Sequence, residues 1–374
     1  MPAKSPQPLM KDGLGREAAQ RLRSAFEQID PSFDGQQFQR QVMRGLAQLE
    51  LKARVNHFIQ CLDRQLPTDY LAALDTVVAA GDMLRNDGQS TAQNFFAPWP
   101  VVDWVGSRGV DKAEASLAAL RQLTSVFSAE FAVRPFILAD SKATLAVFST
   151  WLDDSDHHVR RLVSEGTRPL LPWGVQLPVF REDPKPALAL LESLKDDESE
   201  YVRRSVANHL NDVAKDHPRI TTDLARDWWQ GASDERKALV KHGLRTLIKK
   251  GDPRALSVLG FTTKPNINAK LALAHGRLRV GGTQEISLQL VSTGKKKQKL
   301  VVDYAVHHQR AAGRVSAKVF KWKNVEVAPG ETLSLQKNHA FVPRSVRRLY
   351  PGTHKIEVLV SGQPMGSVEF ELVK

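Results

Sequence analysis

Residues 153–166 read DDSDHHVRRLVSEG, and residues 196–209 read DDESEYVRRSVANH. The second stretch is an imperfect copy of the first, 43 positions later. This separation lies within the roughly 40–47 residues that are typical of a HEAT-type helical repeat. In both copies an acidic turn precedes Val-Arg-Arg and a helix of small residues. We therefore predict helices that stack on their neighbours in an α-solenoid, which builds a long concave surface.

Helical periodicity extends well beyond the two copies, from Gly13 to about Leu259. Turn signals such as Asp30-Pro31 and Asp252-Pro253 separate many of the segments. Many short helices with acidic turns favour a solenoid over a bundle. The predicted helices cover residues 14–29, 38–66 (two helices meeting near Leu49), 70–78, 111–123, 129–139, 143–152, 157–164, 186–194, 200–213, 221–230, 233–249 and 253–259.

The differences between repeat copies indicate where function could lie. Glu165 in the first copy aligns with Asn208 in the second. A third, weaker copy from Ala238 to Leu247 adds His242 to the same row. All three side chains offer charge or hydrogen bonds, which is unusual for a row that only packs against other helices. The row therefore predicts a surface that contacts a ligand.

After Phe261 the pattern changes from helices to strands. Apolar and polar residues alternate in 285–291, 317–322 and 355–360, and Gly or Pro turn signals separate these runs. About seven short strands in roughly 110 residues are typical of an immunoglobulin-like sandwich. We predict two domains: a HEAT-like helical domain over residues 1–262 and an all-β immunoglobulin-like domain over residues 263–374.

The positive charge is concentrated in the β domain. The chain carries a net charge of +12, and the segment from Phe261 onward holds 19 Lys and Arg against 7 Asp and Glu. The preceding part, with 34 of each sign, is neutral. A basic module joined to a neutral one suggests a polyanionic partner, most often nucleic acid. A cationic surface that only keeps the protein soluble is the alternative.

Composition also bounds the compartment. The single cysteine, Cys61, excludes an intramolecular disulfide and suits a reducing environment. Residues 1–20 contain no apolar run of signal-peptide length, and no segment is long and apolar enough to span a membrane. We expect a monomeric cytoplasmic protein without a membrane partner.

Several common catalytic patterns are absent from the sequence. It has no Walker-type phosphate loop, no His-Glu-x-x-His and no Cys/His metal pattern, and Gly281-Gly282 lacks the following helix that a dinucleotide site requires. We therefore expect no metal and no cofactor.

Two carboxylates are candidates for the chemistry. Glu130 precedes Arg134 by four residues, so it could equally be a first-turn acid in an i,i+4 ion pair. Glu165 follows Arg161 by four, and a solvated intrahelical pair is again possible. The small neighbours Ser164 and Gly166 favour the functional interpretation, because they leave the Glu165 carboxylate uncovered.

An aromatic residue follows the second carboxylate. Trp173 lies in RPLLPWG, residues 168–174, where two prolines stiffen an extended loop. A tryptophan on such a loop could pack against the face of a sugar or base, or it could fill a gap between repeats.

Cationic and polar side chains near these residues could contact phosphates. One Arg of each Arg-Arg pair is expected to bond the acidic turn of a neighbour and to be structural. Residues 295–297 lie between two predicted strands, which predicts a hairpin loop that could solubilise the domain or contact nucleic acid. The candidate DNA-binding residues are Arg134, Arg160, Arg161, Arg168, Arg203, Arg204, Asn208, His209, Lys241, His242, Arg245, Lys295, Lys296 and Lys297.

These segments resemble the AlkC branch of the AlkC/AlkD DNA alkylation-repair glycosylases. The resemblance covers roughly residues 9–261, and some AlkC members also carry a C-terminal immunoglobulin-like domain. The motifs that carry it are SAEFAVRPF at 128–136, HVRRL at 158–162, SEGTRP at 164–169, LPWG at 171–174, YVRRSVANHLND at 201–212 and LELKAR at 49–54.

The resemblance implies excision of cationic N-alkylated bases, chiefly 3-methyladenine, from double-stranded DNA in base excision repair. A cationic base leaves without a general acid, and the oxocarbenium-like sugar is the group that needs stabilising. Glu130 and Glu165 would line this cation, one of them positioning water, and Trp173 would pack against the deoxyribose. The family is expected to leave the base in the stack, without base flipping.

A non-catalytic solenoid that binds nucleic acid or an acidic protein is the competing hypothesis. Composition and repeats alone favour such a scaffold, since most HEAT arrays are interaction modules, and the motif resemblance reverses that preference.

Overall fold

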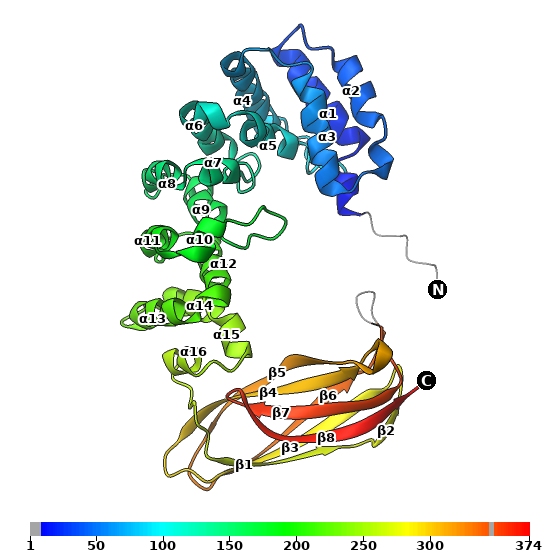
Figure 1. The fold of residues 1–374 in the computed structure, drawn as a ribbon, viewed down its shortest axis with the longest axis vertical. Helices are drawn as coiled ribbons and strands as arrows, with labels where there is room; N and C mark the ends of the chain where they lie inside the picture. The colour runs from blue at the N-terminus through cyan, green and yellow to red at the C-terminus, as the bar shows by residue number, and fades with distance from the viewer. Residues whose placement is uncertain (1–8, 344–347) are drawn as a thin grey trace. The chain divides into compact units, whose positions relative to one another are not determined.

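The protein is described by a computed structural model, which places residues 9–343 and 348–374 (Figure 1). The chain divides into two compact units, Met1–Asp216 and His217–Lys374. A helical region followed by a β-rich region is the architecture that the sequence predicts, and this part of the prediction is confirmed.

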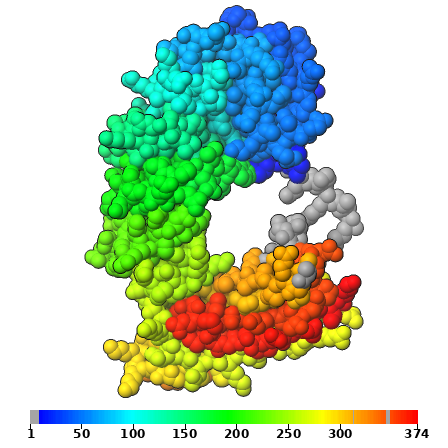
Figure 2. Space-filling model, in the orientation of Figure 1, coloured from blue at the N-terminus to red at the C-terminus, as the bar shows by residue number. Residues whose placement is uncertain are grey.

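The first unit is helical, and its side chains pack into one continuous body (Figure 2). The helices α1, α4 and α6 pack in succession, as do α3, α5 and α7. Further along the chain α9 packs on α12, and α8 packs on α11. The bounds are α1 Arg16–Ile29, α2 Gly35–Met43, α3 Leu51–Asp63, α4 Tyr70–Asn86, α5 Pro98–Arg108, α6 Ala113–Leu123, α7 Arg134–Ala139, α8 Ser141–Ser149, α9 His157–Gly166, α10 Pro178–Glu182, α11 Lys185–Leu194 and α12 Glu200–Asp216, with short 3₁₀ helices at Met10–Gly13, Leu46–Gln48 and Val110–Lys112.

The 43-residue repeat recurs in three dimensions. The Arg160 guanidinium donates to the carbonyl oxygens six and five residues earlier, at 2.7 and 3.2 Å. Arg203 makes the same two bonds in the second copy. Arg160 also bonds Asp197 of the following copy in a buried ion pair, at 2.7 Å. The first Arg of each pair therefore ties an acidic turn to its own helix, and Arg160 also links one repeat to the next.

The structure differs from the predicted helices at several places. α5 and α10 were not predicted, α4 extends to Asn86 beyond the predicted end at residue 78, and α7 begins at Arg134 instead of residue 129. No helix is predicted over α5, because Pro98 and Pro100 suggest a break, yet proline is tolerated in the first turn of a helix. The predicted third copy of the repeat is interrupted, because α14 ends at Gly243 and a new helix begins at Arg245.

The second unit begins with helices and continues as two β-sheets. One sheet has the order β1-β3-β6, and the other has the order β2-β8-β7-β4-β5. Apolar side chains from both sheets, such as Leu288 and Val302, share one buried core between them. The bounds are α13 Pro218–Trp229, α14 Asp234–Gly243, α15 Arg245–Lys249, α16 Pro253–Val258, β1 Ile267–Leu273, β2 Arg277–Arg279, β3 Thr283–Ser292, β4 Gln298–Gln309, β5 Val315–Val327, β6 Thr332–Ala340, β7 Gly352–Val360 and β8 Gln363–Val373.

The change from helices to strands falls between Val258 and Ile267, where the sequence pattern changes. Four helices nevertheless belong to the same compact unit as the sheets. The division into domains at residues 262 and 263 stays a prediction.

No helix among the residues that the structure describes is both long enough and apolar enough to cross a membrane.

Candidate active site

Arg161 joins the two candidate carboxylates. Its Nη1 lies 2.9 Å from Oε2 of Glu130 and donates to Oγ of Ser128 at 2.7 Å, while its Nη2 lies 3.6 Å from Oε1 of Glu165. Burial lowers the pKa of the Arg161 guanidinium, but the charges of Glu165 and Glu130 outweigh it and leave the pKa raised. The guanidinium therefore remains charged between two carboxylates that are 35 residues apart in the chain.

The local alternatives for these carboxylates can now be compared with their contacts. Glu130 lies in a turn before α7 rather than within a helix, and its ion pair is with Arg161, not with Arg134. The i,i+4 pair of Glu165 with Arg161 exists, but Glu165 is only 5% exposed, so the pair is not a solvated one.

Glu165 is held from several sides. Its Oε1 accepts a bond from Arg168 at 2.6 Å, and its Oε2 accepts one from Ser205 on α12 at 2.6 Å. Arg168 also bonds Oδ2 of Asp212 at 2.8 Å. Burial lowers the pKa of Arg168, and Glu165 and Asp212 more than reverse that effect. This network spans α9 and α12 and fixes the direction of the Glu165 carboxylate.

His209 on α12 contacts the C-terminal end of α9. Its side chain is fully buried, and Nδ1 lies 3.0 Å from the carbonyl oxygen of Ser164. Its Nε2 has no hydrogen-bond partner among the described residues. Burial lowers the pKa of His209 to about 4, so the ring is neutral at neutral pH and Nδ1–H donates to Ser164.

Arg134 fixes the loop that carries Trp173. Its guanidinium donates to the carbonyl oxygens of Gly166 and Arg168 at 3.0 Å each, and to that of Val175. Burial, together with the charge of Arg168, lowers the pKa of Arg134 to about 10. One buried cation thus holds both ends of the loop.

Trp173 is displayed rather than packed. Its side chain is 56% exposed, and its backbone φ of 66° lies in the left-handed region that disfavours a bulky residue. A tryptophan that filled a gap between helices would be buried. Strained residues on rigid loops are frequent at functional sites, and this one fits an interaction with a ligand.

Lys52 on α3 connects the loop to the carboxylate segment, although the sequence pattern gives it no role. Its Nζ donates to the carbonyl oxygen of Trp173 and lies 5.4 Å from the ring centroid of Phe131. Phe131 follows Glu130 directly. Lys52 belongs to the LELKAR motif, which was the available signal.

Asp103 on α5 is a further acid near Glu130. Burial raises the pKa of its carboxyl to about 7, against the bond that it accepts from Nε1 of Trp99 at 2.7 Å and the charge of Lys52, and Glu130 adds to the rise. Ser128, Ser205, Asp212 and Asp103 were not identified from the sequence, because their roles depend on contacts between distant segments.

The predicted DNA-binding residues of the first unit fall into two groups. Arg134, Arg160, Arg168 and His209 are buried, and their bonds lie within the protein, which argues against direct contact with DNA. Arg203 is half-buried and bonds the acidic turn. Accessible side chains remain in the other group: Arg161 over the ring of Tyr201, Arg204 paired with Glu200 at 2.6 Å, and the half-buried Asn208.

The remaining candidates lie in the second unit. Lys241, His242 and Arg245 are on α14 and α15, and Nη1 of Arg245 donates to the carbonyl oxygen of His242. The predicted row of Glu165, Asn208 and His242 crosses from one unit to the other and stays a prediction.

The loop at residues 295–297 is not a hairpin within one sheet. It connects β3 to β4, and these strands belong to different sheets. An alternating pattern reveals strands but not their partners, which explains the error. Lys295, Lys296 and Lys297 are exposed, and Lys297 pairs with Glu326 on β5.

Among the described residues, potential metal-ligand atoms of Asp156, His157 and His158 lie within 4.8 Å of one another. Asp156 already caps α9 by accepting a bond from the backbone of His158. Both histidine rings pack against Tyr201. These contacts account for the cluster as a structural feature.

Three comparisons identify known proteins that this chain resembles. The family described as "Uncharacterised protein YhaZ, C-terminal Ig-like domain" matches residues 268–374. The uncharacterized protein YhaZ of Bacillus subtilis is 34% identical over 328 residues, which cover 87% of this chain and 88% of that protein. The structure of Pseudomonas fluorescens alkylpurine DNA glycosylase AlkC bound to DNA containing an abasic site analog is 36% identical, with a TM-score of 0.90 over 98% of this chain and 100% of that one.

Proposed function

Because the chain belongs to the AlkC-type family of alkylpurine DNA glycosylases and carries a C-terminal Ig-like domain, we propose that it is a monofunctional DNA glycosylase that excises cationic alkylated bases. Its principal substrate would be 3-methyladenine in double-stranded DNA. The observation that carries the proposal is the bridge from Glu130 through Arg161 to Glu165.

The chemistry of the substrate explains why this arrangement suits it. Methylation at N3 places a positive charge on adenine, so the base departs as a neutral molecule and needs no proton. As the glycosidic bond lengthens, positive charge develops on the deoxyribose. Carboxylates that are already oriented toward this charge lower the barrier, because they do not need to reorganise during the reaction.

The two acids differ in how they are held, and this difference suggests separate roles. Both oxygens of Glu165 accept bonds from protein donors, so we assign it the electrostatic role. Glu130 uses Oε2 for both of its described contacts, with Ser128 and Arg161. Its Oε1 can therefore accept a bond from the attacking water, and we assign Glu130 the general-base role.

The exposed Trp173 would pack against the deoxyribose from the rigid loop. This arrangement lets the protein approach the sugar without an enclosed base pocket, and the family resemblance likewise favours excision without base flipping. The glycosidic bond breaks and the neutral base leaves with its electron pair, water adds to the cationic sugar carbon and gives a proton to Glu130, and an abasic site remains in the DNA.

Binding to the duplex would use accessible cations of both units. We assign this role to the cationic or polar side chains of Arg204, Asn208, Lys241, His242, Arg245 and Lys295 to Lys297, and to the edge of Arg161 that remains exposed, with the basic β region supplying most of the charge. Affinity for undamaged duplex should fall steeply with salt, since phosphate contacts release counterions. Binding that does not change with salt would argue against DNA as the partner.

The decisive experiment measures base release from N-methylated duplex DNA by the wild type, Glu130→Gln and Glu165→Gln. The control is Glu114→Gln, which neutralises an exposed carboxylate on α6. We expect a steep loss of 3-methyladenine release in both site variants with DNA binding retained, and little change in the control.

The competing function would give a different result. If the folded wild type binds DNA but releases no base, the protein is a DNA-binding scaffold and the enzyme proposal fails. Rescue of a glycosylase-deficient bacterial strain on a methylating agent provides a second readout, because a scaffold should give no rescue.

A further inference from the structure

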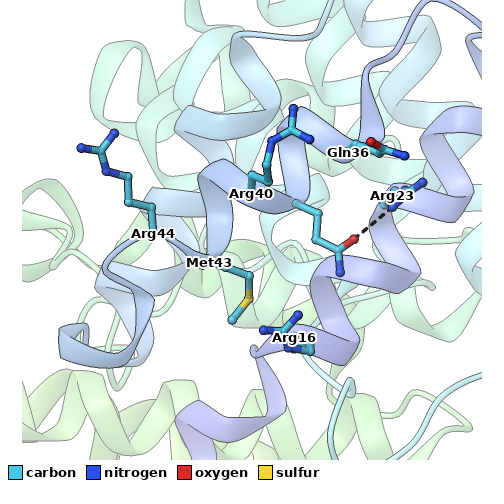
Figure 3. Close-up of a pocket in the computed structure, with 7 residues that line it drawn as sticks. Arg16, Arg23, Gln36, Arg40, Met43 and Arg44 are labelled. Atoms are coloured by element: carbon cyan, nitrogen blue, oxygen red, sulfur yellow. Dashed lines mark hydrogen bonds between the residues drawn. The ribbon is translucent and has the colours of Figure 1, made fainter.

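A cationic cleft lies between α1 and α2, at the N-terminal end of the first unit. It has a volume of about 570 Å³ and is lined by four arginines and no acidic residue. Figure 3 shows Arg16 and Arg23 on one helix and Arg40 and Arg44 on the other side of the cleft. The lining residues are Arg16 and Arg23 of α1, Gln36, Gln39, Arg40 and Met43 of α2, and Arg44, which directly follows α2.

The arginines share one face because of their spacing. Arg16 and Arg23 are seven residues apart on α1, which is about two helical turns. The residues from α2 recur at intervals of three and four, so they form a single stripe. Apart from Met43, the residues of this stripe are polar or charged. A stripe with the same spacing that packed against another helix would be apolar. The spacing therefore indicates an exposed helix face that is mostly cationic and polar.

Most of this charge is not neutralised within the described part of the chain. Arg23 bonds Glu27 at 2.9 Å and Gln39 at 3.2 Å. Arg16, Arg40 and Arg44 are exposed, and their guanidinium groups form no hydrogen bond or ion pair with any described residue. Grouped like charges repel one another and do not stabilise the fold, so the arrangement favours an anionic ligand.

A short series of contacts connects the start of α1, next to the cleft, with the candidate active site. Just before α1, Lys11 pairs with Glu50 at the start of α3, at 2.7 Å. Two residues further on, Lys52 contacts the carbonyl oxygen of Trp173. The starts of α1 and α3 and the Trp173 loop are therefore consecutive neighbours.

We propose that this cleft binds the phosphate backbone of duplex DNA on one side of the lesion, which rests on the proposed function. We take the cleft to lie about two interhelical spacings from Trp173. At 8–10 Å for each spacing, this distance is on the order of 20 Å. At about 3.4 Å per nucleotide along one strand, the cleft contacts phosphates roughly six nucleotides from the lesion.

The extent of the cleft favours a polymer over a small anion. Seven residues of helix rise by about 10 Å, so Arg16 and Arg23 span about three nucleotide steps. Inorganic phosphate would contact only part of this array. A duplex would place successive phosphates against it, and Gln36 and Gln39 could add amide donors.

The test compares Arg40→Gln/Arg44→Gln with Lys142→Gln/Lys185→Gln, which removes the same charge from exposed positions on α8 and α11. Affinities are measured across a salt series for undamaged duplexes and for lesion duplexes whose arms extend three or twelve base pairs, on either side in turn. Base release is measured in a single turnover at saturating enzyme.

We expect the cleft variant to bind the long-arm duplexes more weakly, roughly tenfold at low salt. Its slope of log affinity against log salt should be shallower by about 0.9 for each lost phosphate contact. The effect should depend on which arm is long and vanish when that arm is short. The control should match the wild type, and base release at saturation should stay unchanged in both variants.

The proposal is overturned if the cleft variant retains the wild-type affinity and salt slope, or if it loses affinity equally on short-arm and long-arm duplexes. Competition by millimolar inorganic phosphate without any dependence on arm length would make the cleft a site for a small anion instead. Absence of base release by the wild type would defeat the proposed function but not this inference, because undamaged duplex still tests the cleft.

Discussion

Replacing the buried His209 by asparagine should remove a large part of the acid sensitivity of the first unit. The asparagine amide can occupy the position of Nδ1 and continue to donate to the carbonyl oxygen of Ser164, as the imidazole does at 3.0 Å. Unlike the imidazole, it cannot take up a proton. The substitution therefore separates the titration of His209 from its hydrogen bond.

The magnitude follows from the pKa of the buried ring. Burial lowers the pKa of His209 from 6.5 to about 4, so an unfolded chain takes up a proton at mildly acidic pH that the folded chain rejects. Stability is thus fully present above pH 6.5 and is lost as the pH falls toward 4. Between pH 8 and pH 5 this linkage lowers the free energy of unfolding by about 2 kcal/mol.

The assay is urea unfolding followed by far-ultraviolet circular dichroism at pH 8 and pH 5. The wild type should lose about 2 kcal/mol more than His209→Asn between the two conditions. Thr167→Ala is a suitable control, because Thr167 is buried nearby and has no titrating side chain. If wild type and His209→Asn lose the same stability at pH 5, the ring is not held neutral and the reasoning is refuted.

Three further predictions address other parts of the first unit. Burial raises the pKa of Asp103 to about 7, so its titration by itself should lower the free energy of unfolding by about 3 kcal/mol as the pH rises from 5 to 8, and in the same urea assay the free energy of the wild type relative to Asp103→Asn should fall by that amount. Ser205→Ala removes a buried donor from Glu165, which should slow single-turnover base release while leaving the dissociation constant for DNA within about twofold. Arg160→Ala leaves Asp197 buried and unpaired, which should cost about 3–5 kcal/mol in urea unfolding, and a loss below 1 kcal/mol would contradict the linking role of this pair.

Much of the fold could be predicted because its signals are local. The helical period, the acidic turns and the alternating strands after Phe261 each depend on residues a few positions apart, so they are visible in the sequence. The repeat at residues 153–166 and 196–209 also identified which Arg-Arg pairs to compare. Local signals failed at α5, where prolines in a first helical turn resemble a break, and at β3 and β4, whose sheet partners lie far away in the chain.

For the candidate site, the sequence could indicate which residues belong to it but not how they are arranged. Glu130, Glu165 and Trp173 were singled out from motifs, but their surroundings depend on stacking between segments that are tens of residues apart. Arg161 reaches Glu130 only because α9 lies beside the turn before α7, and Ser205 reaches Glu165 only because α12 packs on α9.

The sequence by itself determined the two kinds of structure, the uneven charge and the residue types of the candidate site. Only the tertiary structure decided which cations are buried and which remain accessible. Arg168 and His209 resemble surface cations in the sequence, yet both are buried. Arg168 forms an ion pair with Asp212, and His209 forms a hydrogen bond with the carbonyl oxygen of Ser164. Arg16, Arg40 and Arg44 carry no motif, and they became a candidate DNA contact only when α1 and α2 placed them around one cleft. The physical reason is that periodicity is written in neighbouring residues, whereas solvation and ion pairing depend on what the folded chain brings into contact.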